Sequence, residues 1–168
     1  MNAAQKMPIL LRAAYLAMHR STNAHLARSG VTADQFVLLC VLAKGSALMQ
    51  QDLARRSSSD PNTIRPMLEI LEGRGLVTRQ WHPTDGRART AKLTTKGLKT
   101  WKKLNAASEP VRERLLAAFR PAETPTVLDI LGRIAEAMEL PISHGTGPRR
   151  AAPDKIKTRR RKPARRKR

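Results

Sequence analysis

The 168-residue sequence has few of the residues that build disulfides, metal sites or aromatic cores. Its single cysteine, Cys40, cannot form an internal disulfide or a four-ligand zinc site. Aromatic side chains make up only 3% of the chain, so a core must come from Leu, Ala, Val, Ile and Met, a mixture that favours helices. The apolar run at residues 7–18 is interrupted by Arg12 and is too short to span a bilayer, and no export signal is recognisable. We therefore expect a mainly helical, soluble intracellular protein.

The sequence also lacks the spacings that catalysis and metal binding require. Its four histidines form no HExxH motif, and no cluster of acidic residues accompanies them. It has no glycine-rich phosphate loop and no nucleophile motif. Cys40 falls on the apolar side of a predicted helix, which is typical of a small core residue rather than a redox switch. We therefore expect no catalytic residue, no metal and no cofactor, and a protein that is not an enzyme.

Basic residues are in large excess, with 33 Lys and Arg against 13 Asp and Glu and a net charge of +20. Twelve of the basic residues fall in residues 149–168 beside a single acid, and the rest of the chain still carries a net charge of +9. A chain that is basic in both parts is expected to bind a polyanion, and nucleic acid is the first candidate. An acidic membrane surface is the second, and charge that only keeps the protein in solution is the third.

Hydrophobic periodicity and capping motifs predict a series of helices with one hairpin. A capping box at Thr32–Gln35 and an N-terminus at Asp60-Pro61 mark two helix starts. We expect helices at residues 5–28, 33–43, 50–56, 61–75, 94–107, 110–119 and 122–139, and strands at residues 76–81 and 88–93. Beyond Pro141 the apolar period stops, and disorder is expected. Three middle helices followed by a hairpin predict a winged helix-turn-helix, in which the helix from Pro61 enters the major groove of DNA.

The solvent side of the helix from Pro61 and the basic hairpin are the expected DNA-contacting surfaces. Apolar residues spaced i, i+3, i+4 and i+7 from Ile64 define the buried side of that helix. Asn can pair with adenine and Arg with guanine, while Arg87 near the hairpin tip can enter the minor groove with Asp85 as its brace. The expected contacts are Ser59, Asn62, Thr63, Arg65, Pro66, Glu69, Arg79, His82, Asp85, Arg87, Arg89 and Lys92. The alternative is that both surfaces are simply solvated.

The sequence resembles the MarR family of transcriptional regulators over residues 31–97. The specific part is LEGRGLVTR at residues 71–79, followed by the wing HPTDGRAR and by LTTKG. Two departures are visible: three serines precede the recognition helix, and Pro66 lies inside it. The resemblance implies a homodimer on a pseudo-palindromic operator in double-stranded DNA, released by a small-molecule effector. Tyr15 and Trp101 are candidates for the effector pocket, with core or dimer packing as the alternative.

Together these observations predict a mostly α protein with a winged helix-turn-helix core, a two-stranded β-hairpin wing and flanking dimerisation helices. The expected boundaries are a dimerisation helix at residues 1–30, the DNA-binding domain at 31–94, further dimerisation helices at 95–141 and a disordered basic tail at 142–168. The expected function is a homodimeric MarR-type repressor of nearby genes in the cytoplasm, associated with the nucleoid and not with membrane. The alternative is a low-specificity architectural DNA binder that relies on its basic tail.

Overall fold

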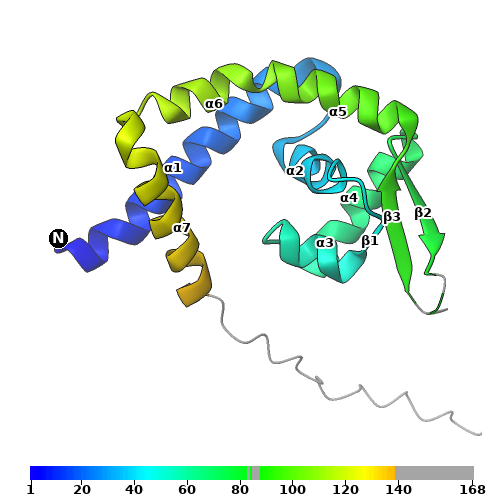
Figure 1. The fold of residues 1–168 in the computed structure, drawn as a ribbon, viewed down its shortest axis with the longest axis horizontal. Helices are drawn as coiled ribbons and strands as arrows, with labels where there is room; N and C mark the ends of the chain where they lie inside the picture. The colour runs from blue at the N-terminus through cyan, green and yellow to red at the C-terminus, as the bar shows by residue number, and fades with distance from the viewer. Residues whose placement is uncertain (83, 85–87, 139–168) are drawn as a thin grey trace, which may run out of the picture. The chain divides into compact units, whose positions relative to one another are not determined.

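The computed structural model describes residues 1–82, 84 and 88–138, which form helices and one small antiparallel sheet (Figure 1). The elements are α1 (Ala3–Leu26), α2 (Ala33–Leu42), β1 (Leu48–Met49), α3 (Gln50–Arg56), α4 (Pro61–Gly73), β2 (Val77–Trp81), β3 (Arg89–Leu93), α5 (Thr95–Ala107), α6 (Glu109–Leu116) and α7 (Thr124–Met138). Short 3-10 turns at Ala27–Ser29 and Pro121–Glu123 follow α1 and precede α7. The expected mostly helical winged fold is confirmed.

The helix starts follow the capping residues. The Thr32 hydroxyl accepts a hydrogen bond from the Gln35 amide, and the Gln35 side chain accepts one from the Thr32 amide, which satisfies two free donors at the start of α2. At the start of α4, Asp60 Oδ1 accepts from the Asn62 amide at 2.7 Å and Pro61 occupies the first helical position. These contacts fix where α2 and α4 begin.

The core lies within the winged helix domain and consists of aliphatic side chains. Leu39 of α2, Leu53 of α3, and Ile64 and Leu71 of α4 are fully buried. Replacing one such buried Leu by Ala typically costs about 2–5 kcal/mol, so these contacts hold α3 and α4 at a fixed angle. Between the two helices Ser58 takes a left-handed conformation with φ 49°, which makes the turn tight.

The sheet has three strands, one more than the expected hairpin. β2 and β3 pair antiparallel with Val77 opposite Leu93 and Trp81 opposite Arg89. β1 pairs with the other edge of β3, with Leu48 opposite Ala91, so the strand order is β1-β3-β2. The extra strand ties the loop before α3 to the base of the wing.

Arg74, at the end of α4, joins the winged domain to the end of α1. Its guanidinium donates to the carbonyls of Ser29 and Gly30, each at 2.6 Å, and its own carbonyl accepts from Lys96 Nζ at 2.8 Å. One residue thereby links α4 with the α1–α2 junction and with α5.

The chain divides into two units, residues 1–124 and 125–168. In the second unit, Arg133 Nε pairs with Asp129 Oδ2 at 3.0 Å along α7. All 15 residues of α7 are described, and none of them is buried. Leu128 and Met138 are more than three-fifths exposed, at 65% and 72%.

Candidate nucleic-acid interface

The solvent side of α4 carries the polar residues expected from the sequence. Ile64, Leu68 and Leu71 point into the core, and the opposite side is exposed. The exposed residues on that side are Asn62, Thr63, Arg65, Pro66 and Glu69, while Ser59 just before the helix is half-buried. The N-terminal turn of α4 therefore presents an amide, a hydroxyl and a guanidinium, the groups that read base edges and hold phosphates.

A chain of alternating charges joins this surface to the wing. Arg65 Nε donates to Glu69 Oε1 at 3.2 Å, one turn along α4. Glu69 also lies 3.8 Å from Arg79 on β2. Glu69 thus stands between the exposed Arg65 and the strand that carries Arg79.

Arg79, which the sequence predicts as a DNA backbone contact, is paired with an acid within the fold. Its Nε and Nη2 lie 2.7 and 2.6 Å from Glu72 Oε2, and its side chain is only 15% exposed. Its backbone amide also donates to Glu72 Oε1, at 3.2 Å. The hydrogen bonds from Arg79 lower the pKa of Glu72. This arginine braces β2 on α4 because its charge is already engaged by a carboxylate.

The wing presents a cation stacked on an aromatic ring. The Arg89 guanidinium lies 4.5 Å from the centre of the Trp81 ring, a cation–π contact on exposed parts of the paired strands. Lys92 on the same strand is exposed, and the His82 amide donates to the Ala88 carbonyl at 2.9 Å where the strands end. The expected contacts Asp85 and Arg87 lie outside the described residues, so their roles stay predictions.

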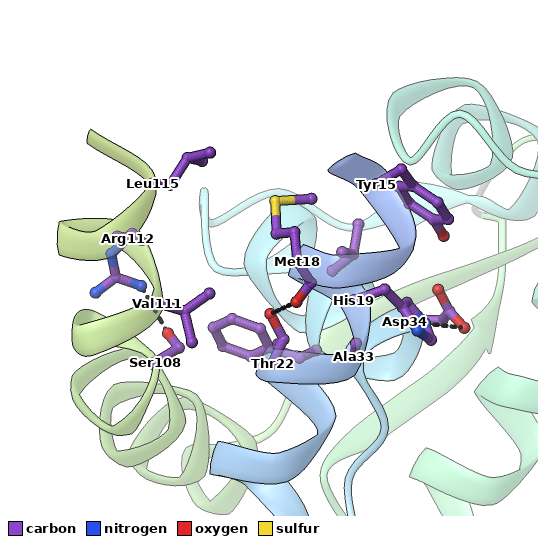
Figure 2. Close-up of a pocket in the computed structure, with 12 residues that line it drawn as sticks. Tyr15, Met18, His19, Thr22, Ala33, Asp34, Ser108, Val111, Arg112 and Leu115 are labelled. Carbon is purple, nitrogen blue, oxygen red and sulfur yellow. Dashed lines mark hydrogen bonds and ion pairs between the residues drawn. The ribbon is translucent and has the colours of Figure 1, made fainter. Parts of the chain in front are cut away.

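A cavity of about 210 Å³ opens between α1, α2 and α6 (Figure 2). Its lining residues are Tyr15, Met18, His19, Thr22, Ala33, Asp34, Phe36, Val37, Ser108, Val111, Arg112 and Leu115. Tyr15, one of the two candidates for an effector pocket, lies in this lining. Trp101, the other candidate, is not in the lining: it is half-buried on α5 and packs against the core. Both effector roles stay predictions.

Cys40 is half-buried next to the same core rather than fully enclosed. Burial raises the pKa of its thiol, an effect partly offset by the neighbouring Trp101 indole and by Arg112. A raised pKa lowers the thiolate fraction, which is the reactive form, so the thiol fits a packing role.

Sequence reasoning missed most of the pocket, including His19, Asp34 and Arg112. His19 stacks loosely on Tyr15, with ring centres 5.7 Å apart, because the two residues are one turn apart on α1. The spacing of four residues between Tyr15 and His19 was the signal in the sequence that could have placed His19 beside Tyr15. The described residues hold no group of three His, Cys, Asp or Glu arranged for a metal ion. None of the described helices is both long and apolar enough to cross a membrane.

Comparison with known proteins agrees with this arrangement. The MarR family model matches residues 31–88. The transcriptional repressor Rv2887 of Mycobacterium tuberculosis is 32% identical over 113 residues, which covers 66% of this chain and 81% of the relative.

Two solved structures share the fold over most of their length. BpsR of Bordetella bronchiseptica, whose DNA binding is regulated by 6-hydroxynicotinic acid, aligns with a TM-score of 0.73 and 25% identity over 81% of this chain and 97% of that one. The repressor CouR, bound to a 23-mer DNA duplex, aligns with a TM-score of 0.68 and 27% identity over 75% and 89%. The chain therefore belongs to the MarR family of winged helix-turn-helix transcriptional regulators, which are DNA-binding proteins and not enzymes.

Proposed function

We propose that this chain is a homodimeric repressor that binds a pseudo-palindromic operator near its own gene and is released by a small-molecule effector. The observation that carries the proposal is the exposed first half of α4, where Asn62 and Arg65 stand clear of the core beside a basic wing. Asn and Arg are the side chains that pair bidentately with adenine and guanine in the major groove. Such a protein would act in the cytoplasm on the chromosome.

The proposed dimer rests on apolar surface that a single chain leaves in water. Leu10 and Ile9 of α1 are 65% and 55% exposed, and Leu116 of α6 is 54% exposed. Exposed apolar surface of this extent marks an interaction site. We assign residues 1–30 and 95–141 to dimerisation and residues 31–94 to DNA binding. A two-fold dimer would set two copies of α4 on successive major grooves.

The effector role is supported by the position of the pocket. Its walls come from α1 and α6, which belong to the proposed dimerisation part, and from α2, which belongs to the winged domain. A molecule bound there contacts both parts, so it can favour one of their relative positions over another. The regulation of BpsR by 6-hydroxynicotinic acid is a precedent within the fold.

A low-specificity architectural DNA binder is the second candidate. The observation that favours it is the run of twelve Lys and Arg in residues 149–168. Basic side chains that reach phosphates add affinity for any DNA sequence, and they carry no base information. In that case the winged domain would only hold the DNA backbone.

Fluorescence-anisotropy binding to the DNA upstream of its own gene and to a scrambled duplex tests the proposal. Arg65→Ala is expected to weaken binding to the upstream DNA by about 10- to 100-fold, the value of one bidentate base contact, and to change binding to the scrambled duplex little. Arg133→Ala is the matched control, because Arg133 is also an exposed arginine paired with an acid one helical turn away. Equal losses on both duplexes for Arg65→Ala would favour the architectural function instead.

A further inference from the structure

Among the charged side chains that line the pocket, Arg112 is paired with a carboxylate, whereas Asp34 is paired only with the His19 ring. We propose that the pocket takes a ring-sized ligand that is positively charged, or neutral with a hydrogen-bond donor, and that it discriminates against carboxylates. This inference rests on the proposed effector role of the pocket and adds the chemical class of the effector.

The size and walls of the cavity suit one substituted ring. A dry cavity of about 150 Å³ is enough to hold benzene, and this one measures about 210 Å³. Most of its wall is apolar, from Met18, Phe36, Val37, Val111 and Leu115. The polar side chains around it therefore decide which ligand charge is accepted.

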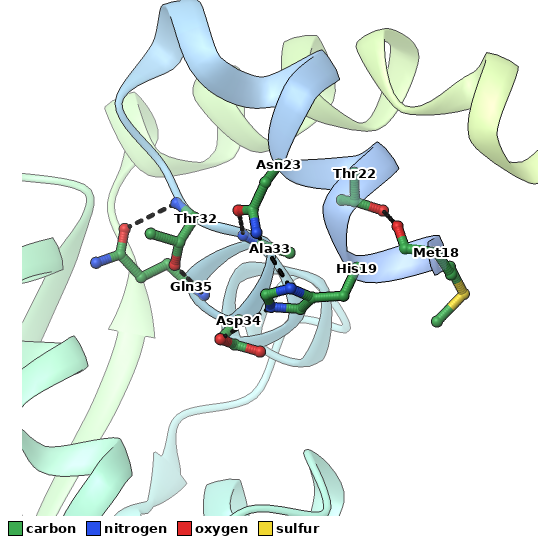
Figure 3. Close-up of polar contacts among 8 residues, drawn as sticks. All are labelled: Met18, His19, Thr22, Asn23, Thr32, Ala33, Asp34 and Gln35. Carbon is green, nitrogen blue, oxygen red and sulfur yellow. Dashed lines mark hydrogen bonds and ion pairs between the residues drawn. The ribbon is translucent and has the colours of Figure 1, made fainter. Parts of the chain in front are cut away.

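His19 lies between Asn23 and Asp34, and the hydrogen bonds of Asn23 decide which ring nitrogen of His19 accepts and which donates (Figure 3). Asn23 Oδ1 accepts from the Ala33 amide at 2.8 Å, which turns the Asn23 NH₂ group toward His19. That NH₂ lies 3.2 Å from His19 Nδ1, so Nδ1 must be the acceptor and carries no proton. The proton is therefore on Nε2, which donates to Asp34 Oδ2 at 3.2 Å. The Nε2 donor of His19 is thus directed at Asp34 and is not free for an anionic ligand.

The Arg112 guanidinium already binds groups at the end of α5 and the start of α6. Its Nη1 donates to Ser108 Oγ at 2.6 Å and its Nη2 to the Asn105 carbonyl at 2.7 Å. Nη2 also pairs with the carboxylate of Glu109, one turn back on α6. An anionic ligand would have to compete with Glu109 for this guanidinium.

Two of the three hydroxyl groups of the lining, those of Thr22 and Ser108, already donate within the protein, and the third is the Tyr15 phenol. Thr22 Oγ1 donates to the Met18 carbonyl at 2.9 Å (Figure 2). Ser108 Oγ donates to the Asn105 carbonyl at 2.9 Å. A carboxylate ligand would gain no hydrogen bond from either hydroxyl without breaking one of these.

Asp34 is the acid of the lining that pairs with no Lys or Arg of the described residues. Its side chain is 54% exposed, and its ion-pair neighbour is His19, whose Nε2 lies 3.2 Å from Asp34 Oδ2. A carboxylate within about 4 Å attracts a cation and repels an anion, so ligands of one shape and opposite charge should differ about 10- to 100-fold in affinity.

Three probes of equal size separate the charge of the ligand from its shape: benzylamine, benzyl alcohol and benzoate. Each is titrated into the full-length ¹⁵N-labelled protein at neutral pH, and the amide shifts of Val37 and Val111 report occupation of the pocket. Benzylamine is expected to bind tightest and benzoate about 10- to 100-fold more weakly, with dissociation constants of order 1 mM for the best fragment. Asp34→Asn should remove most of the difference between benzylamine and benzoate while it leaves benzyl alcohol nearly unchanged. Glu109→Gln, which frees Arg112, should strengthen benzoate.

Asp52→Asn is the matched control, because Asp52 lies on α3, pairs with Arg55 and does not line the pocket. It should leave the order of the three probes unchanged. The inference is overturned if benzoate binds as tightly as benzylamine, if the difference persists in Asp34→Asn, or if no probe shifts the pocket amides below about 10 mM. Operator affinity measured with saturating probe tests the effector role separately: an unchanged affinity would sink that role and leave the order of probe binding intact.

Discussion

Glu72 and Arg79 form the ion pair that attaches the wing to the recognition helix. Arg79 is nearly buried, and Glu72 accepts two hydrogen bonds from it, one from the backbone amide and one from Nε, and forms an ion pair with its Nη2. A basic residue of the wing therefore serves the fold, while Arg65 and Arg89 remain exposed and able to reach DNA. Arg79 and Arg89 both belong to the basic hairpin, so their roles differ because one side chain is paired with Glu72 and the other is exposed.

The pair makes stability depend on pH in a predictable direction. Because the pKa of Glu72 is lower in the folded protein than in the unfolded chain, its contribution is complete above about pH 4.3 and is lost as pH falls through the folded pKa. Glu72→Gln should therefore cost about 1 kcal/mol at pH 7, a modest value since Glu72 is 35% exposed. Urea denaturation at pH 7 and at successively lower pH should show the wild-type advantage shrink toward acid.

Glu123→Gln provides the comparison, because Arg120 lowers the pKa of this exposed acid in the same way but across no junction between elements. It should change the unfolding free energy less than Glu72→Gln does. A Glu72→Gln protein that equals wild type at pH 7 would show that the pair contributes nothing to attaching the wing.

At the scale of elements, local motifs predicted more than long-range packing. The capping residues Thr32 and Asp60 fixed two helix starts from sequence, since their hydrogen bonds close within three residues. β1 could not be predicted, because two residues show no alternation and Leu48 becomes a strand only by pairing with Ala91, more than forty positions later. The pocket could not be predicted for the same reason. It brings residues of α1 and α2 next to Arg112, and no periodicity along the chain relates such distant residues.

Pro66 in α4 has an internal comparison in Pro8 of α1, since each is the sixth residue of its helix. Either proline removes one helical hydrogen bond, so Pro66→Ala and Pro8→Ala should each raise the unfolding free energy by about 1–3 kcal/mol. Only Pro66 lies on the exposed side of the recognition helix. Because an internal proline tends to bend a helix, Pro66→Ala should also alter the docking of α4 and lower operator affinity, about tenfold.

Chemical denaturation and anisotropy on the same samples measure both effects. Pro8→Ala should raise stability and leave operator affinity unchanged. If Pro66→Ala binds the operator as wild type does, a helix bent at this proline is not required for docking.

The close approach of Leu76 explains why position 97, in the LTTKG segment after the hairpin, is a glycine. A Cβ at this position would lie 1.9 Å from the carbonyl oxygen of Leu76, which also accepts a hydrogen bond from the Thr94 amide. Gly97→Ala must therefore push α5 away from the start of β2, at a cost of about 3 kcal/mol or more. Gly73→Ala is the control, because nothing lies within 4 Å of its Cβ position. It should be neutral or stabilise by up to about 1 kcal/mol, measured as the shift in urea midpoint, and equal effects of the two substitutions would contradict the steric argument.

At the scale of the whole molecule, the charge distribution separates affinity for DNA from recognition of its sequence. Residues 149–168 hold 12 of the 33 basic residues, and the remaining 148 positions still carry a net charge of +9. The tail can add to the attraction for phosphates, but the groups that we propose to read bases belong to α4 and the wing. The repressor and the architectural functions therefore differ in which part of the chain sets the preference for one DNA sequence.

Salt dependence measures this division. The chain that ends at Gly147 should bind its operator with a shallower dependence on salt, since each phosphate that the protein no longer neutralises reduces the slope of log K against log salt by about 0.9. A full-length chain with the twelve Lys and Arg replaced by Gln should behave the same way, which shows that charge and not length is responsible. Operator and scrambled DNA should weaken together in both, so their affinity ratio is unchanged. If the ratio instead vanishes with the basic residues, the tail and not α4 governs binding, and the architectural function is the better account of this protein.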